Sequence, residues 1–229
     1  MMTMVGLVFA MIALHFRLQE TTAAPSPDPL EQRVSLLEFK NETLGEALGR
    51  VNQSFDISIS IEGVLPEEGT ITNPKFTATI ENRTLAEVFD QLCALDTRYV
   101  WTRDGNNVNL FPRANLNDPT YFFNRVLPVL RFHDLRKVGD AVVALDHQAG
   151  DPSGGVIFMG IGPKQGLASP WTQSFKNITV RQALNRIARQ LGPTYGWQIG
   201  GTTKARLIVF HYKLEARHVE LGDQYSYRP

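Results

Sequence analysis

Three stretches of this chain align with one another without gaps: KNETLGEAL at residues 40–48, ENRTLAEVF at 81–89 and KNITVRQAL at 176–184. Each contains Thr-x-x-Glu or Thr-x-x-Gln, the capping box in which the threonine hydroxyl and the acidic or amide side chain bond to backbone N–H groups at the start of a helix. Apolar residues follow at the first, fourth, fifth and eighth helical positions, which places one apolar stripe on each helix. The pattern therefore predicts three amphipathic helices, beginning at Leu44, Leu85 and Val180.

A fourth, degenerate copy of the pattern lies between the second and third copies. Here Asp134 is the expected N-cap, and the apolar stripe is Leu135, Val138, Val142 and Leu145. The tripeptides at Asn41, Asn82 and Asn177 also match the N-glycosylation pattern, as does one at Asn52. Threonines that recur at one position of a repeated helix start are more simply explained as caps.

Alternating segments between these helices predict half-buried strands, such as Phe55 to Ile61, in which Asp56, Ser58 and Ser60 point away from the apolar face. A hairpin is expected around Asp104-Gly105-Asn106, and another around Gly200-Gly201. The order βαββαββ then occurs twice, which predicts an α+β protein made of two tandem small modules. The expected division is a signal peptide at 1–24, a Pro-rich linker at 25–32, a first domain at 33–113, a linker at 114–120, a second and more divergent domain at 121–214, and a polar tail at 215–229.

The N-terminus has the features of a targeting segment. Residues 4–14 form an apolar run shorter than the roughly 20 residues of a membrane-spanning helix, and a small-residue site ends near Ala24. We therefore expect secretion with cleavage near Ala24. No Lys or Arg precedes the apolar run, and an uncleaved segment would act instead as a weak membrane anchor.

Composition narrows the classes of function. Lys plus Arg number 23 and Asp plus Glu 23, so the formal net charge is zero, which argues against a general polyanion binder. A single cysteine, Cys93, excludes an intramolecular disulfide framework. The net charge of zero is the sum of two opposite charges: residues 1–113 carry a net charge of 9 − 15 = −6, and residues 114–229 carry 14 − 8 = +6. These charges either form solvated faces or, because their signs are opposite, dock the two domains on each other or stack molecules head to tail.

Residues 37–112 resemble the short N-terminal domain (STN, or N0-like signalling domain) of outer-membrane secretins and TonB-dependent receptors. The likeness lies in Leu44 to Leu48, in Thr84 to Leu92 and in a hairpin from Tyr99 to Val108. Asn177 to Leu191 match best in the second copy. The resemblance implies a periplasmic, non-enzymatic protein-interaction module of the cell envelope. The implied partners are a secretin, a TonB-dependent receptor, an anti-sigma-type protein or a second copy, and no secretin pore domain follows in the sequence.

No residue pattern predicts a catalytic, metal or cofactor site. His133-Asp134 and Asp146-His147 lie near opposite ends of one expected helix, too far apart to share an ion. The loop-rich segment 148–171 keeps open an alternative, a periplasmic small-ligand-binding protein or enzyme. Candidate partner-binding residues are the charged side chains on equivalent helix faces: Arg181, Arg186 and Arg189 in the second domain, and Glu46, Glu87 and Asp90 in the first.

Overall fold

The computed structural model describes residues 28–65, 72–150, 156–160, 166–202 and 206–214. The first half, residues 33–112, consists of β1 (Arg33–Thr43), α1 (Leu44–Ser54), β2 (Ser58–Glu62), β3 (Lys75–Thr84), α2 (Leu85–Leu95), β4 (Tyr99–Asp104) and β5 (Asn107–Pro112). The second half, residues 126–212, consists of β6 (Val126–Lys137), α3 (Val138–Ala149), β7 (Val156–Gly160), β8 (Gly166–Thr179), α4 (Val180–Leu191), β9 (Tyr195–Gly201) and β10 (Arg206–Tyr212). The α+β class is confirmed. The described residues contain no helix that is both long and apolar enough to cross a membrane.

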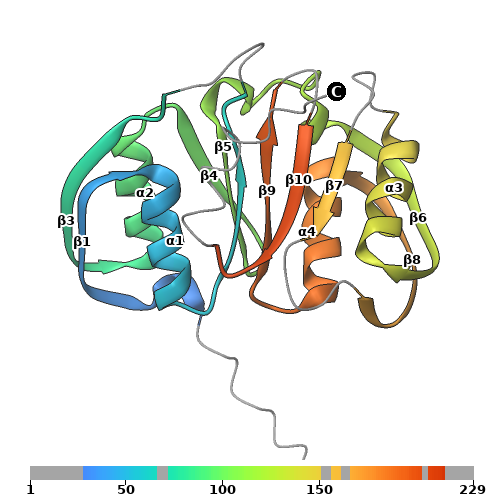
Figure 1. Ribbon diagram of the computed structural model, residues 1–229, viewed down its shortest axis with the longest axis horizontal. Helices are drawn as coiled ribbons and strands as arrows, with labels where there is room; N and C mark the ends of the chain where they lie inside the picture. The colour runs from blue at the N-terminus through green and yellow to red at the C-terminus, as the bar shows by residue number, and fades with distance from the viewer. Residues whose placement is uncertain (1–27, 66–71, 151–155, 161–165, 203–205, 215–229) are drawn as a thin grey trace, which may run out of the picture.

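The elements form five layers (Figure 1). A six-stranded sheet with the order β4-β5-β2-β9-β10-β7 stands in the centre. Helices α1 and α2 cover one of its faces, and α3 and α4 cover the other. Outside each helix pair lies a two-stranded antiparallel sheet, β1-β3 on one side and β6-β8 on the other. The two halves therefore share one continuous sheet.

Strand pairing defines how the halves are related. The three strands β4-β5-β2 and their counterparts β9-β10-β7 follow each other in the same order along the sheet. Strand β9 runs parallel to β2, whereas its counterpart β4 runs antiparallel to β5 and hence opposite to β2. Side-chain direction alternates along a strand, and the core residue Ile61 pairs with Gln198, whereas Glu62 pairs with the core residue Ile199. The halves thus run in opposite directions and place their helices on opposite faces.

Each half has its own apolar core between its helices and sheets. The first core contains the stripe residues of α1 and α2 together with Ile57, Ile59 and Ile61. The second contains the stripes of α3 and α4 with Trp197, Ile208 and Phe210. Trp101, Trp171 and Trp197 lie on β4, β8 and β9.

Three of the four helix starts confirm the capping boxes. Thr43, Thr84 and Thr179 each accept a hydrogen bond from the backbone N–H three residues on, and the residue at that position reaches back to the threonine N–H. The asparagine two residues before each threonine has a positive φ, 55° at Asn41 and 51° at Asn82 and Asn177. Asn is among the few residues other than Gly that adopt this left-handed conformation readily. The Asn-x-Thr tripeptide is therefore a turn-and-cap device.

Replacing Asn82 with alanine is expected to lower the free energy of unfolding by about 1 kcal/mol, because an alanine Cβ is strained at φ 51°. Asn82→Gly is the matched control and should stay within about 0.5 kcal/mol of the parent, since Gly tolerates this conformation. Urea unfolding followed by circular dichroism measures both. Equal losses in the two variants would contradict the conformational explanation.

The expected start of α3, the helix predicted from the degenerate fourth copy of the pattern, was wrong. Helix α3 begins at Val138, its N-cap is Lys137, and no side-chain cap is present there. Asp134 lies in β6 at a β-bulge with φ 50°, and its N–H donates to Thr172 Oγ1 just as the N–H of Asn41 donates to Thr77 Oγ1. Asp134 is therefore the counterpart of Asn41, and Leu135 belongs to the strand.

Two further boundaries differ from expectation. Strand β8 begins at Gly166, which pairs with Lys137 of β6, so residues 166–170, expected in a loop, belong to a strand of the outer sheet. In the expected linkers, Pro29–Glu31 form a 3₁₀ turn capped by Asp28, and Arg113–Asn115 form another. The signal peptide at 1–24 and the tail at 215–229 lie outside the described residues.

Candidate functional site

The junction between the halves is the first candidate site. Strands β2 and β9 pair in parallel at Ile61 and Glu62, and the Gly63 N–H donates to the Ile199 carbonyl at 3.1 Å. Gly196 of β9 lies so close to β2 that a Cβ added to it would be 1.8 Å from the Ile59 carbonyl oxygen. Only a glycine fits at this position, because any side chain would overlap the neighbouring backbone.

A buried polar network crosses the junction. Ser58 and Ser60, expected on the solvent side of their strand, and Asn107 are at most 3% exposed because the second half covers them. The Asn107 amide donates to Ser60 Oγ at 2.9 Å and to Asn185 Oδ1. Asn185 Oδ1 also accepts from Trp197 Nε1 at 2.8 Å. Hydrogen bonds satisfy these buried groups and fix the orientation of α4 over β2 and β5.

A buried ion pair accompanies the network. Arg181 of α4 donates through Nε and Nη2 to the two carboxylate oxygens of Glu62, whose side chain is 1% exposed. The third guanidinium nitrogen, Nη1, donates to Asn124 Oδ1 at 2.7 Å, and the guanidinium lies 4.0 Å from the centre of the Phe111 ring. Burial raises the pKa of Glu62, and the charge and hydrogen bonds of Arg181 oppose that rise. Burial and the Glu62 carboxylate likewise raise the pKa of Tyr121.

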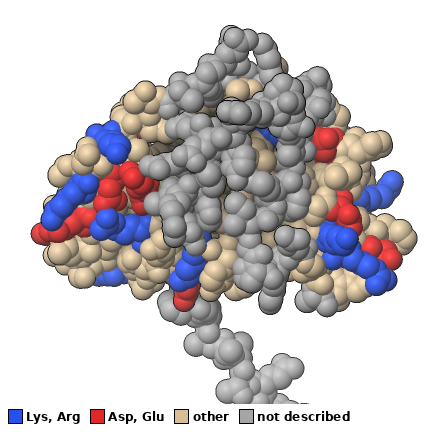
Figure 2. Space-filling view, in the orientation of Figure 1, with Lys and Arg blue, Asp and Glu red and all other residues tan. Residues whose placement is uncertain are grey.

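The acidic residues of the first half and the basic residues of the second half meet at this junction. Ion pairs across it join Glu62 to Arg181, Asp104 to Arg189 at 3.0 Å and Asp56 to Lys213 at 3.3 Å. In all three pairs the acid belongs to the first half and the base to the second. On the face shown in Figure 2, the remaining blue and red side chains are interspersed on both sides.

The predicted partner-binding residues lie in different settings. Arg181 and Arg189 form ion pairs within the chain across the junction, and the side chain of Arg181 is only 12% exposed. Arg186 is half-buried on the same helix. Glu46 and Glu87 complete capping boxes, and Asp90 accepts a hydrogen bond from Trp101 Nε1 at 2.8 Å. Sequence reasoning missed Glu62, because a lone acid at the end of a strand carries no signal of burial.

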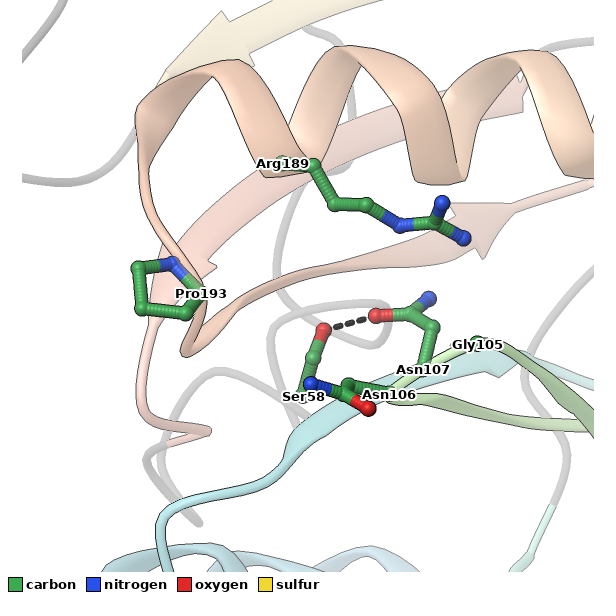
Figure 3. Close-up of a pocket in the computed structure, with 6 residues that line it drawn as sticks. All are labelled: Ser58, Gly105, Asn106, Asn107, Arg189 and Pro193. Carbon is green, nitrogen blue, oxygen red and sulfur yellow. Dashed lines mark hydrogen bonds between the residues drawn. The ribbon is translucent and has the colours of Figure 1, made fainter. Parts of the chain in front are cut away.

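A cleft of about 450 Å³ opens beside the network. Its lining is Ser58, Gly105, Asn106, Asn107, Arg189 and Pro193 (Figure 3). Figure 3 shows the Arg189 side chain extended above Asn107, and Ser58 hydrogen-bonded to Asn107. Ser58 Oγ also bonds to the Tyr195 carbonyl, and Arg189 Nη2 donates to the Asp104 carbonyl at 2.8 Å. Most polar groups of this cleft are thus engaged in holding the halves together.

The second candidate is a groove between α2 and β4 in the first half, defined here as the α2–β4 groove. Its volume is about 460 Å³, and it is lined by Asp90, Cys93, Ala94, Thr97, Val100, Trp101 and Arg113. Strand β4 ends the six-stranded sheet, so no described strand pairs with its outer edge. Unpaired edge backbone is a template for a further strand.

Cys93 lines this groove but is 5% exposed, and burial raises the pKa of its thiol to about 11 from 9.0. A shift of two pH units lowers the thiolate fraction about a hundredfold at neutral pH. We therefore expect iodoacetamide at pH 8 to modify Cys93 at least tenfold more slowly in the native protein than in urea, as mass spectrometry can measure. Equal rates would contradict the buried environment of the thiol.

The described part of the chain gives little support to a metal site or to a ligand-binding loop at 148–171. No three His, Cys, Asp or Glu side chains gather there in a way that could hold a metal ion. Within the segment 148–171, residues 156–160 and 166–171 are strands, and residues 151–155 and 161–165 lie outside the described ranges.

Comparison with known proteins identified no relative of this chain. No protein-family model matches the chain, and no curated protein or solved structure matches it either. The fold and junction define the chain as an α+β protein whose two halves share one sheet.

Proposed function

We propose that this protein is a non-enzymatic interaction module of a cell-envelope assembly, exported to the periplasm. It consists of two tandem modules similar to the STN domain, and it serves secretin-type secretion or TonB-linked transport or signalling. The repeated βαββαββ element order supports the duplication, and the outer edge of β4, with which no described strand pairs, supports the interaction role. A strand from a partner protein would add to this edge.

One observation carries the proposal: this chain already uses the equivalent surface of its second half to accept a strand. The capping threonines align α2 with α4. Trp101 aligns with Trp197, because each indole donates to the helix residue six positions after the capping threonine, Asp90 or Asn185. In the second half, β2 covers the surface formed by α4 and β9. In the first half, the same surface is the open α2–β4 groove.

The backbone of β4 is oriented to accept a strand. A two-residue turn joins β4 to β5, and Asp104 and Asn107 close it. Residues that close such a turn exchange hydrogen bonds, and bonded pairs then alternate along the hairpin. The N–H and carbonyl groups of Trp101 and Arg103 therefore point away from β5. Their counterparts, Trp197 and Ile199, face β2, where Trp197 N–H donates to Ser60 Oγ and the Ile199 carbonyl accepts from Gly63.

Cross-linking and affinity capture from an envelope extract test the proposal. Arg103→Pro removes an outward N–H without touching the ladder to β5, and proline is tolerated on such an edge. Arg103→Ala is the matched control, because it removes the same side chain and keeps the N–H. We expect parent and Arg103→Ala to capture one partner in low salt, with capture weakening as salt rises, and Arg103→Pro to lose it.

A monodisperse, partnerless protein with turnover activity would overturn the interaction role. A partner retained by Arg103→Pro would place the interaction on another surface. Circular dichroism of the three proteins verifies that each is folded. Fusion of residues 1–32 to a reporter that is active only in the periplasm tests export separately.

A further inference from the structure

We propose that the α2–β4 groove binds a single extended segment of a partner protein, running parallel to β4, with an acidic residue ahead of a short apolar run. This inference rests on the proposed function and specifies its partner. The direction follows from the junction, where β2 lies parallel to β9 on the equivalent surface.

The occupant is a free segment rather than the sheet edge of a second copy. At the junction, Gly196 lets the β2 backbone approach β9 closely. Its counterpart in β4 is Val100, which has a side chain at the position where a Cβ on Gly196 would meet the Ile59 carbonyl oxygen. A strand fixed within a sheet cannot move away from this valine locally, whereas an isolated segment can shift along the groove. Two molecules therefore cannot form with β4 the contact that β2 and β9 make within one chain.

The polar contacts of the junction are also missing from the groove. The aligned helix positions place Ala86 where α4 has Arg181, and Ala94 where it has Arg189. Neither alanine can form the ion pairs that Glu62 and Asp104 make at the junction. The groove walls are instead apolar, formed by Cys93, Ala94, Val100 and Trp101. Such walls favour apolar side chains on the segment.

Charge at the rim sets the order of residues along the segment. Arg113 is exposed at the start of β4, where its Nε donates to the Thr97 carbonyl at 3.0 Å and its Nη2 to the Tyr99 carbonyl at 2.9 Å. Within the described residues it has no carboxylate partner, so its charge is available to a ligand. A segment parallel to β4 enters at this end, which places its acidic residue first. Asp90, beside Trp101, disfavours a second acid farther along.

Titration of the full chain with blocked peptides tests the inference. The probe has two aspartates followed by alternating valine and threonine, and two comparison peptides carry lysines in place of the aspartates or a proline in the valine run. We expect the aspartate probe to bind with a dissociation constant in the micromolar to millimolar range and the comparison peptides about tenfold more weakly. Arg113→Glu should reverse the preference between aspartate and lysine, whereas Arg113→Lys should preserve it.

Orientation is measured with a nitroxide label on the probe. A label at the start of the peptide should broaden the amide resonance of Tyr99, and a label at its end that of Arg103. The reverse pattern, an affinity indifferent to Arg113→Glu in a folded variant, or no binding at millimolar peptide would each overturn the inference. Capture of an envelope partner with no peptide preference leaves the proposed function standing and removes this inference. Peptide binding with no captured envelope partner would support this inference and count against the proposed function.

Discussion

Replacing Arg181 with methionine is expected to lower the free energy of unfolding by about 3–5 kcal/mol, because it leaves the Glu62 carboxylate buried without its partner. Methionine retains most of the side-chain volume beside Phe111, so the loss reports on charge more than on packing. Arg186→Met, on the same helix and without a described ion pair, is the matched control and should cost less than about 1 kcal/mol. Urea unfolding at neutral pH measures both.

The cost of Arg181→Met should depend on pH. Burial raises the pKa of Glu62 above its ordinary value of 4.5, and the variant lacks the arginine that opposes the rise. The folded variant therefore binds a proton at a higher pH than the unfolded chain, so its stability falls as pH rises through the interval between those two pKa values. Acidification from pH 7.5 towards pH 5 should narrow the gap between variant and parent.

A second substitution separates charge from structure. Glu62→Gln in the Arg181→Met background removes the unpaired charge, and most of the lost stability should return and lose its pH dependence. A double variant as unstable as the single one, with no narrowing in acid, would contradict a buried ion pair at the junction.

Introducing valine at Gly196 is the other change with a large expected effect. The new Cβ would lie 1.8 Å from the Ile59 carbonyl oxygen, and backbone atoms on neighbouring strands cannot rotate away as a side chain can. We expect β2 and β9 to separate at a cost of roughly 3 kcal/mol or more, at the upper end for overpacked sites. Unfolding should split into two transitions, and small-angle scattering should show a larger radius of gyration as the halves part.

Gly166→Val is the control for valine at a strand glycine, because the nearest atom to a Cβ there is 4.0 Å away. It should unfold in one transition with stability close to that of the parent. The counterpart of Gly196 in β4 is already valine, Val100, so this strand position accepts the side chain where no strand lies against it. A folded Gly196→Val protein with unchanged stability and dimensions would contradict the close contact.

Local pattern was sufficient for the helices that carry a capping box. The capping hydrogen bonds of Thr43, Thr84 and Thr179 join residues three positions apart, so sequence alone specified their helix starts. The same pattern was misleading at α3, where Lys137 is the N-cap and no side chain caps the helix. Asp134 there has the left-handed role of the asparagines, which looks the same as a cap in a sequence.

The sequence predicted which face of a strand is buried only where that face packs against elements of the same half. The alternation from Phe55 to Ile61 correctly identified the apolar face of β2, but Ser58 and Ser60 are buried as well. Their cover comes from α4 and β9, more than 100 residues away in the chain, as the 137-residue separation of Ser58 and Tyr195 illustrates. Polar side chains that meet only at a junction have no periodic signal.

The class of fold, the repeated element order and the opposite charges of the halves could be read from the amino-acid sequence, because each depends on spacing or composition along the chain. Tertiary structure alone decided where those charges meet, which acid is buried, and which equivalent surface stays open. Those outcomes depend on how β2 and β9 pair, and that pairing depends on a glycine at 196 where β4 has a valine at 100. The valine at this strand position, together with alanines in place of Arg181 and Arg189, thus separates the surface that we propose binds a partner from the one that holds the chain together.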